Sequence, residues 1–279
     1  MRKIENLLKK ILLSLAGILI LFSLYLGFKS ASNDRNWAVG FDVLPEIKID
    51  SLTVTIKNVR NFKHISNDSF IVDYYNRTYS LDKLESLWFI LSPFANHWRG
   101  PAHSFLSFGF SDSQYVSISV EARKEVEESY SIIGGILKKY ELMYVIGDEH
   151  DLIGLRTVIW DDDVFVYPIR TEKENIKKLF FDVLERAEKL QTAPEFYNTI
   201  WSNCTSNLYD HVNKIWPDRL PGGWKLIFTG YSDELIYESN LMKTHLSLEE
   251  TRKYFRVNDR AKKYFNMDKF STLIRDFAN

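Results

Sequence analysis

The chain has 279 residues, of which 45% are hydrophobic and 15% aromatic, so it can bury a sizeable core in one large domain or two small ones. The net charge is −1 and residues 31–279 are mildly acidic, which argues against a nucleic-acid-binding protein, because such proteins need clustered Lys and Arg. The single cysteine, Cys204, excludes an intrachain disulfide and a lipid-modified cysteine near the amino terminus.

Residues 11–28 form an uncharged apolar run at the amino terminus. As a helix, these residues span roughly 27 Å, close to the hydrocarbon thickness of a bilayer. Lys9 and Lys10 precede the run and Lys29 follows it. The positive-inside rule therefore predicts an anchor over residues 1–30 in the cytoplasmic (inner) membrane, with the amino terminus inside and the rest periplasmic. A signal peptide cut near Ala31 and a buried core helix are the alternatives.

Strand patterns follow a linker that we assign to residues 31–50. Leu52, Val54 and Ile56 alternate with polar residues, which predicts a half-buried strand. Further strands are predicted over residues 68–75, 103–110, 115–123, 141–146 and 164–168, and the pair 103–110 and 115–123 reads as a hairpin. The spacing of apolar residues over 82–91 predicts a helix.

Helix signals dominate after residue 170. Thr171 and Glu174 predict a capping box, and an apolar stripe runs from Ile176 to Leu190. A second helix is predicted over 203–215, and the last forty residues read as helical. Strands followed by helices predict an α+β fold. We assign residues 51–230 to the catalytic domain and residues 231–279 to a helical carboxyl-terminal extension.

Cys204 is the first residue that carries reactive chemistry. Ser202 and Asn203 are good N-cap residues, so the thiol is predicted in the first turn of a helix. The unpaired amides and the helix dipole there favour a thiolate and lower the pKa of the thiol, and the same amides can hold an oxyanion. A small buried hydrophobic cysteine is the equally weighted alternative.

A nucleophilic cysteine needs a base, and His103 is the strongest of the six histidines. It opens a predicted strand, which holds a base more rigidly than the loop that carries His97. His211 lies two helical turns from Cys204, roughly 10 Å along the axis, too far for a hydrogen bond. A satisfied core or surface histidine is the alternative for His103. No ligand spacing indicates a metal site, and we predict no cofactor.

Glu121 and Arg123 lie two residues apart on the next predicted strand and therefore on one face. A carboxylate there can orient an imidazole as the third member of a triad. Spacing alone favours the simpler interpretation, an ion pair between Glu121 and Arg123 or with neighbours.

Several strings resemble one bacterial family: AHSFLSFGF, YVSISVEARKE, YELMYVIGDEHDLIGLRT, DVFVYP and PEFYNTIWSNCTSNL. The resemblance is to the Lnb N-terminal periplasmic domain, long a domain of unknown function and named after a lipoprotein N-acyltransferase. It covers most of residues 35–230, with SVEAR and the NCT block as its most specific parts. The order His, carboxylate, Asn-Cys is also similar to circularly permuted papain-like enzymes, including relatives of lecithin:retinol acyltransferase.

The resemblance implies a papain-like antiparallel sheet packed on helices, with Cys204 as nucleophile, His103 as base and Glu121 as orienting group. It also implies Asn203 and the Cys204 amide as oxyanion donors. We expect Arg123 to contact the substrate. The implied activity is acyl transfer from a membrane phospholipid, through a thioester, to the amino-terminal cysteine of a lipoprotein. A lipid esterase or cell-wall amidase and a non-catalytic tethered binding domain are the alternatives.

Overall fold

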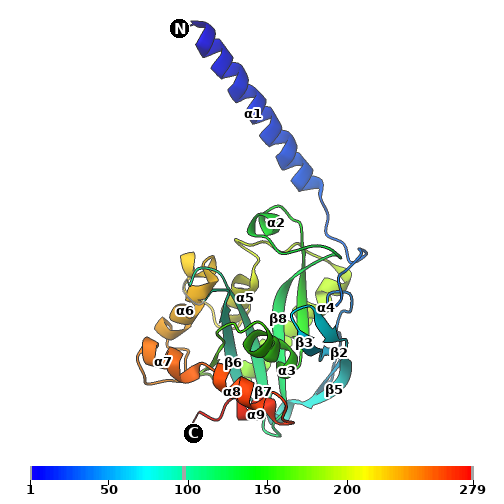
Figure 1. Cartoon of the computed structure of the whole chain (residues 1–279), viewed down its shortest axis with the longest axis vertical. Coiled ribbons are helices and arrows are strands. Elements are labelled where there is room, and N and C mark those ends of the chain that lie inside the picture. The colour runs from blue at the N-terminus through cyan, green and yellow to red at the C-terminus, as the bar shows by residue number, and fades with distance from the viewer. Residues whose placement is uncertain (1, 96–98, 278–279) are drawn as a thin grey trace.

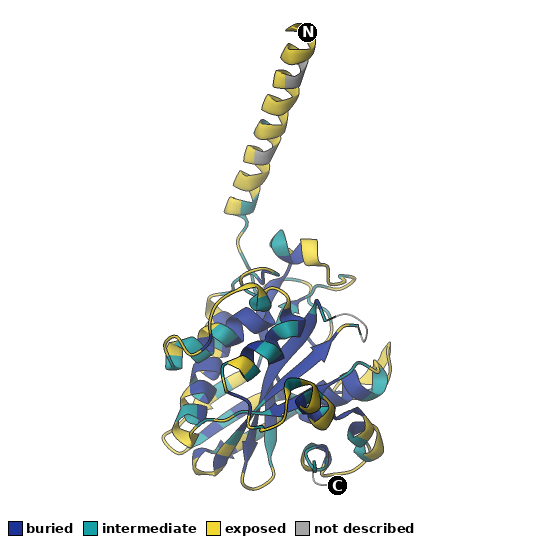
Figure 2. Cartoon of the chain, turned by 90° about the vertical axis from the view of Figure 1, so that its left-hand side faces the viewer, coloured by how far each residue is buried: buried dark blue, intermediate teal, exposed yellow. Residues whose placement is uncertain are grey.

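A computed structural model describes residues 2–95 and 99–277. Its first element, α1 (Arg2–Phe28), stands away from the folded domain as a single long helix (Figure 1). Within the described residues, Ile4–Phe28 is the one helix that is long and apolar enough to cross a membrane. No described residue of its uncharged stretch is buried, which agrees with a candidate membrane span and argues against a core helix (Figure 2).

The domain is an α+β fold built on a mainly antiparallel sheet in the order β1-β2-β9-β8-β7-β6-β10, with β5 paired to β2. Its strands are β1 (Glu46–Ile49), β2 (Thr53–Arg60), β5 (Tyr74–Ser80), β6 (Leu84–Pro93), β7 (Ala102–Phe110), β8 (Tyr115–Arg123), β9 (Glu141–Gly147) and β10 (Phe165–Pro168). A separate hairpin pairs β3 (Lys63–Ser66) with β4 (Ser69–Ile71).

The helices after α1 are α2 (Ile132–Ile136), α3 (Glu149–Gly154), α4 (Lys173–Thr192), α5 (Cys204–Ile215), α6 (Ser232–Glu238), α7 (Leu248–Phe255), α8 (Asn258–Tyr264) and α9 (Phe270–Leu273). The 3₁₀ helices are η1 (Leu81–Lys83), η3 (Trp224–Leu226) and η4 (Thr229–Tyr231), and η2 (Leu155–Ile159) is a π-helix.

Two apolar clusters cover the two faces of the sheet. Alternate residues of the central strands divide between them, as Leu106 and Phe105 do on β7. The α4 and α5 side chains pack in the cluster that contains Leu106. Side chains from α3, α8 and α9 pack in the cluster that contains Phe105. The helical residues 231–279 therefore supply part of the cover of the second face (Figure 1).

The single strand predicted over 68–75 is divided in the structure between β4 and β5. Two other local predictions are wrong. Residues 84–93 form the strand β6, not a helix, because the run Leu87–Leu91 lies in a sheet whose two faces are both covered. The capping box at Thr171 does not form, since α4 begins at Lys173 after Glu172, whose side chain makes no cap bond. The predicted hairpin is confirmed as β7 paired with β8.

Candidate active site

Asn203 and Cys204 begin α5, as the sequence predicted. Asn203 is the N-cap: its Oδ1 accepts from the Ser206 amide at 2.9 Å, and the Ser206 hydroxyl accepts from the Asn203 amide at 2.8 Å. This capping box uses the amides of Asn203 and Ser206 and not those of Cys204 and Thr205, which belong to the unpaired first turn of a helix. Those two amides are therefore the donors available to an oxyanion beside the thiol.

The side chain of Asn203 does not act as an oxyanion donor in this geometry, which corrects the prediction. Its Nδ2 donates to the carbonyl oxygens of Thr199 at 2.9 Å and Leu226 at 3.0 Å. Both amide protons are thus used to fasten the start of α5 to two loops. Asn203 positions the helix that carries the thiol.

His103 and Glu121 come together because β7 and β8 are antiparallel neighbours. Phe105 is paired with Ser119, and the same register continued by two residues sets His103 opposite Glu121. His103 Nε2 lies 3.1 Å from Glu121 Oε1 and 2.6 Å from Ser119 Oγ, and Ser119 Oγ donates to Glu121 Oε1 at 2.7 Å. The carboxylate therefore holds the imidazole both directly and through the Ser119 hydroxyl.

Cys204 lies beside the backbone of the residue that precedes His103: its Sγ is 3.8 Å from the Ala102 carbonyl oxygen. The imidazole of His103 lowers the pKa of the thiol, so the two groups interact electrostatically. Glu121 and Ser119 both contact Nε2 of the same ring. The order thiol, imidazole, carboxylate is that of a nucleophile, its base and an orienting group.

The ionisation of the three groups is coupled. Burial lowers the pKa of His103, but the Glu121 carboxylate and the Cys204 hydrogen bond outweigh burial and the Arg156 charge and raise it to about 9. Burial raises the pKa of Glu121, yet His103 and Arg156 hold it well below the usual range. Burial also raises the pKa of Cys204, whereas His103 and hydrogen bonds with Ser104 lower it overall. These directions favour a thiolate–imidazolium pair.

Arg156 is a site residue that the sequence did not reveal. It lies in η2, its guanidinium is 3.6 Å from Glu121 Oε1, and its Nη1 donates to the Leu152 carbonyl oxygen at 2.7 Å. π-Helical turns recur at functional sites. Ser119 was also missed, although its position two residues before Glu121 could have indicated a shared face.

The guanidinium of Arg123, predicted as a substrate contact, is engaged by the linker. Its guanidinium donates to the Phe41 carbonyl oxygen and to Asn33 Oδ1, both at 2.7 Å, and stacks on the Trp37 ring. Its donors thereby fasten the linker to β8. The ion pair between Glu121 and Arg123 is likewise replaced by pairs of Glu121 with His103 and Arg156.

The other histidines have separate surroundings. His211 on α5 is hydrogen-bonded to Asp182 and Tyr144, and His64 is hydrogen-bonded to Asp151. His150 bonds the Phe265 carbonyl oxygen, and His97 lies outside the described residues. Across residues 2–95 and 99–277, no cluster of His, Cys, Asp or Glu is arranged to hold a metal ion.

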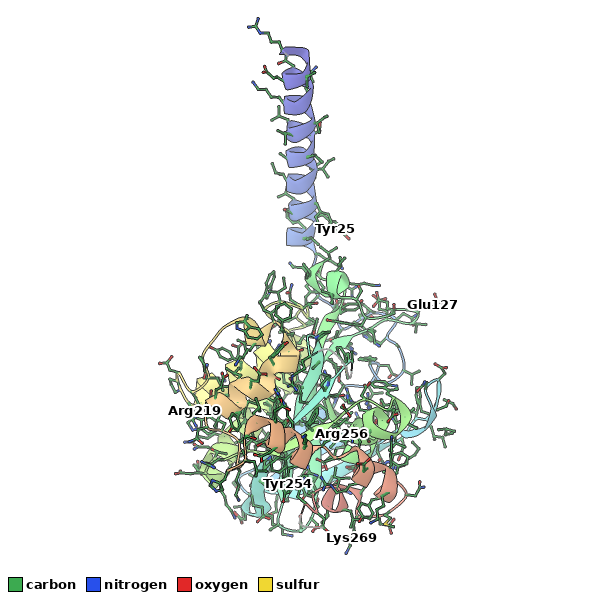
Figure 3. The ribbon with its side chains drawn as sticks, turned by 60° about the vertical axis from the view of Figure 1, so that its left-hand side comes forward. Tyr25, Glu127, Arg219, Tyr254, Arg256 and Lys269 are labelled. Carbon is green, nitrogen blue, oxygen red and sulfur yellow. The ribbon has the colours of Figure 1, made fainter. Side chains whose placement is uncertain are left out.

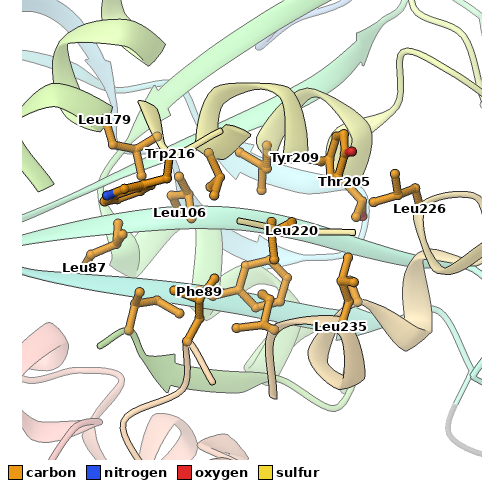
Figure 4. A pocket seen from close by; sticks show the side chains of 16 residues that line it. Leu87, Phe89, Leu106, Leu179, Thr205, Tyr209, Trp216, Leu220, Leu226 and Leu235 are labelled. Carbon is orange, nitrogen blue, oxygen red and sulfur yellow. The ribbon is translucent and has the colours of Figure 1, made fainter. Parts of the chain in front are cut away.

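A narrow apolar cavity of about 50 Å³ lies under α5, next to the site. Thr205, whose Oγ1 is 3.9 Å from Cys204 Sγ and 2.9 Å from Ser104 Oγ, lines one end with Leu226 (Figure 4). Trp216 and Leu87 line the opposite end, and the walls between are almost wholly aliphatic or aromatic. The cavity suits a hydrocarbon group close to the thiol.

A model of one family, described as the Lnb N-terminal periplasmic domain, matches residues 71–230. The chain belongs to this family. The matched stretch contains His103, Ser119, Glu121, Arg156 and Cys204, and it is narrower than the 35–230 suggested by the resemblance. The chain matches no curated protein and no solved structure. The Lnb-type domain and the candidate span of α1 fit a membrane-anchored protein with a periplasmic domain.

Proposed function

We propose that the chain is a membrane-anchored thiol acyltransferase. The observation that carries the proposal is the thiol of Cys204 at a helix start, 3.8 Å from the carbonyl oxygen of the residue before His103, whose imidazole pairs with Glu121 and lowers the pKa of the thiol. The arrangement supports a permuted papain-like enzyme, because the strand with the base precedes the helix with the nucleophile along the chain. The amino terminus is proposed inside, with the Lnb-type domain on the periplasmic face of the inner membrane.

The first half-reaction forms a thioester. The Cys204 thiolate attacks the carbonyl carbon of a phospholipid ester, and the amides of Cys204 and Thr205 hold the oxyanion. When the tetrahedral intermediate collapses, the carbon–oxygen bond breaks and the His103 imidazolium gives its proton to the leaving alkoxide. The acyl group remains on sulfur and the lysolipid leaves.

The second half-reaction transfers the acyl group to an amine. The proposed acceptor is the amino-terminal cysteine of a lipoprotein, whose amine attacks the thioester while neutral His103 takes the proton. The carbon–nitrogen bond forms, the carbon–sulfur bond breaks, and the thiolate is restored. No cofactor takes part in this scheme.

The cavity under α5 supports a lipid rather than a cell-wall peptide as donor. Its polar atoms are few, so the polar backbone of a peptide would lose its hydrogen bonds to water there. The cavity of about 50 Å³ is too small for an acyl chain as it stands, so the proposal requires lining side chains such as Leu226 and Leu235 to move apart. In this scheme the carbonyl carbon stays beside Cys204 while the chain extends past Thr205.

The test uses the full chain in phospholipid vesicles with a diacylglyceryl-cysteine peptide as acceptor. We expect N-acylated peptide and lysophospholipid in equal amounts, and neither with Cys204→Ala. Leu226→Trp, which narrows the cavity mouth, should reduce transfer from long-chain donors more than from short-chain donors, whereas the exposed control Leu246→Trp should not. Release of free fatty acid with no acylated peptide would instead establish a hydrolase, and unchanged transfer in Cys204→Ala would refute the thiol mechanism.

A further inference from the structure

Exposed apolar side chains gather around the start of α5. Three short segments supply them: α2, the turn that precedes Ser202, and η3 with the two residues that follow it. We name this set the apolar rim: Ile132, Ile133, Trp201, Trp224, Ile227 and Phe228. Ile133 is 68% exposed and Trp201 is 67% exposed, and exposed apolar side chains that lie together mark a protein or membrane interaction site.

Hydrogen bonds join the three segments into one surface. Thr199 Oγ1 donates to the Ile132 carbonyl oxygen at 3.0 Å, which fixes the turn to α2. Asn203 Nδ2 donates to the carbonyl oxygens of both Thr199 and Leu226, which fixes the turn to η3. Asn203, which joins the turn to η3, is the N-cap of α5 and directly precedes Cys204. The apolar rim therefore borders the start of the helix that carries the thiol.

The membrane helix leaves the domain at the same end. Lys138, which follows α2, donates from Nζ to the Leu26 carbonyl oxygen of α1 at 2.9 Å, and Lys29 donates to the Lys138 carbonyl oxygen. In Figures 1 and 3, α2 is the element of the domain drawn next to the carboxyl end of α1. The rim thus lies on the side of the domain from which the candidate span departs.

The tether keeps this side close to the bilayer. Asn33 Nδ2 donates to the carbonyl oxygens of Leu190 at 2.9 Å and Gln191 at 2.8 Å, so the chain is already fixed to α4 at residue 33. Residues 29–33 can span no more than about 18 Å even when fully extended. A second copy of the chain is another surface that could cover the rim. The bilayer is favoured because a tether of about 18 Å already holds it close to this side of the domain.

We propose that the apolar rim inserts into the surface of the bilayer in which α1 is anchored, so that the start of α5 faces the lipid headgroups. Apolar faces of peripheral segments enter the boundary between headgroups and acyl chains to a depth of about 5–10 Å. Trp201 and Trp224 suit this depth, because tryptophan prefers the membrane–water interface. This inference rests on the tether and on exposure, and it holds whether or not the thiol transfers acyl groups.

The test measures tryptophan emission of the full chain in phosphatidylcholine vesicles, with lipid brominated near the carbonyl end of its acyl chains as quencher. Trp160 provides a matched control: it is 46% exposed, against 53% for Trp224. It precedes Asp161, which pairs with Lys262 of α8, on the side of the domain far from α1 (Figure 1).

We expect the double variant Trp201→Phe, Trp224→Phe to lose most of the bromolipid quenching. The variant Trp160→Phe should show a fractional quenching at least as large as that of the unmodified chain, because it loses emission that bromolipid does not reach. Quenching in the double variant equal to that of the unmodified chain would overturn the proposal. Shielding of Trp201 and Trp224 from aqueous acrylamide without bromolipid quenching would also overturn it, since protein would then cover the rim. Unchanged thermal midpoints would show that the variants fold.

Discussion

The pairs His103–Glu121 and His211–Asp182 have the same chemistry in two regions of one domain. In each pair a carboxylate oxygen lies within 3.1 Å of a ring nitrogen of a buried histidine. They differ in the third group. His103 lowers the pKa of the Cys204 thiol, whereas His211 Nε2 lies 2.7 Å from the Tyr144 hydroxyl.

Tyr144 cannot serve as an acid or nucleophile in the way that Cys204 can. Burial raises the pKa of Tyr144, in spite of the nearby Arg186 guanidinium. The hydroxyl therefore stays protonated and acts as a hydrogen-bonding group between α5 and β9. A buried histidine–carboxylate pair by itself only connects two elements of the fold. Its capacity for proton transfer depends on the third group that the imidazole contacts.

The largest expected effect separates the two histidines. His103→Gln should lower acyl transfer by about 10²–10⁴-fold, because the general base is lost. His211→Gln, an equally buried matched variant, should keep most of the activity per folded molecule. Initial rates of N-acylation, measured at equal concentrations of folded protein, compare the loss of activity in the two variants. Equal losses in both variants would mean that His103 has no special role.

A smaller effect should follow from Glu121→Gln. The carboxylate keeps the pKa of His103 at about 9, and the imidazolium in turn lowers the pKa of Cys204. With the charge removed, burial and the Arg156 charge lower the pKa of His103 with much less opposition, so less imidazolium is present at neutral pH. The pKa of Cys204 then rises.

The rate of Cys204 alkylation by iodoacetamide, measured against pH, reports this shift. Its midpoint should move to higher pH in Glu121→Gln. The control Asp182→Asn should leave the midpoint in place, because Asp182 pairs with His211 and Lys214. An unmoved midpoint in Glu121→Gln would show that the carboxylate does not act on the thiol.

The smallest effect concerns stability. Burial raises the pKa of Asp182, but hydrogen bonds from His211 and Lys214 lower it overall. A carboxylate with a lowered folded pKa stabilises the fold above its unfolded pKa of about 3.9, and this contribution disappears as pH falls through the folded value. Asp182→Asn should therefore cost about 1–3 kcal/mol of unfolding free energy at pH 7, because His211 loses its charged partner.

Urea unfolding at neutral and acid pH measures this contribution. The difference between the unmodified chain and Asp182→Asn should shrink as the pH drops below about 3.9. A difference that stays constant with pH would show that the pair adds nothing through its charge.

Local sequence patterns predicted the elements that hold the thiol and its base. The N-cap role of Asn203 follows from a short polar signal at a helix start. The hairpin that pairs β7 with β8 follows from alternation and a turn. These features depend on neighbours in sequence, so a single chain reveals them.

Long-range features could not be predicted in the same way. The segment 149–159 was missed because Glu149, Asp151 and Arg156 interrupt its apolar pattern, although all three are buried. Their partners are distant: Arg275 pairs with Glu149, and Arg60 pairs with Asp151. For β6 the opposite error occurred, since burial on both faces removed the alternation that marks a strand.

The most direct test of the central claim is the chemical state of Cys204 during turnover. The full chain is incubated with phospholipid vesicles in the absence of an acceptor, and the peptide that contains Cys204 is examined by mass spectrometry. The account predicts an acyl mass on this peptide that hydroxylamine removes, that a diacylglyceryl-cysteine peptide discharges, and that is absent in His103→Gln at early times. No acyl mass on Cys204, together with N-acylation that persists in Cys204→Ala, would contradict it.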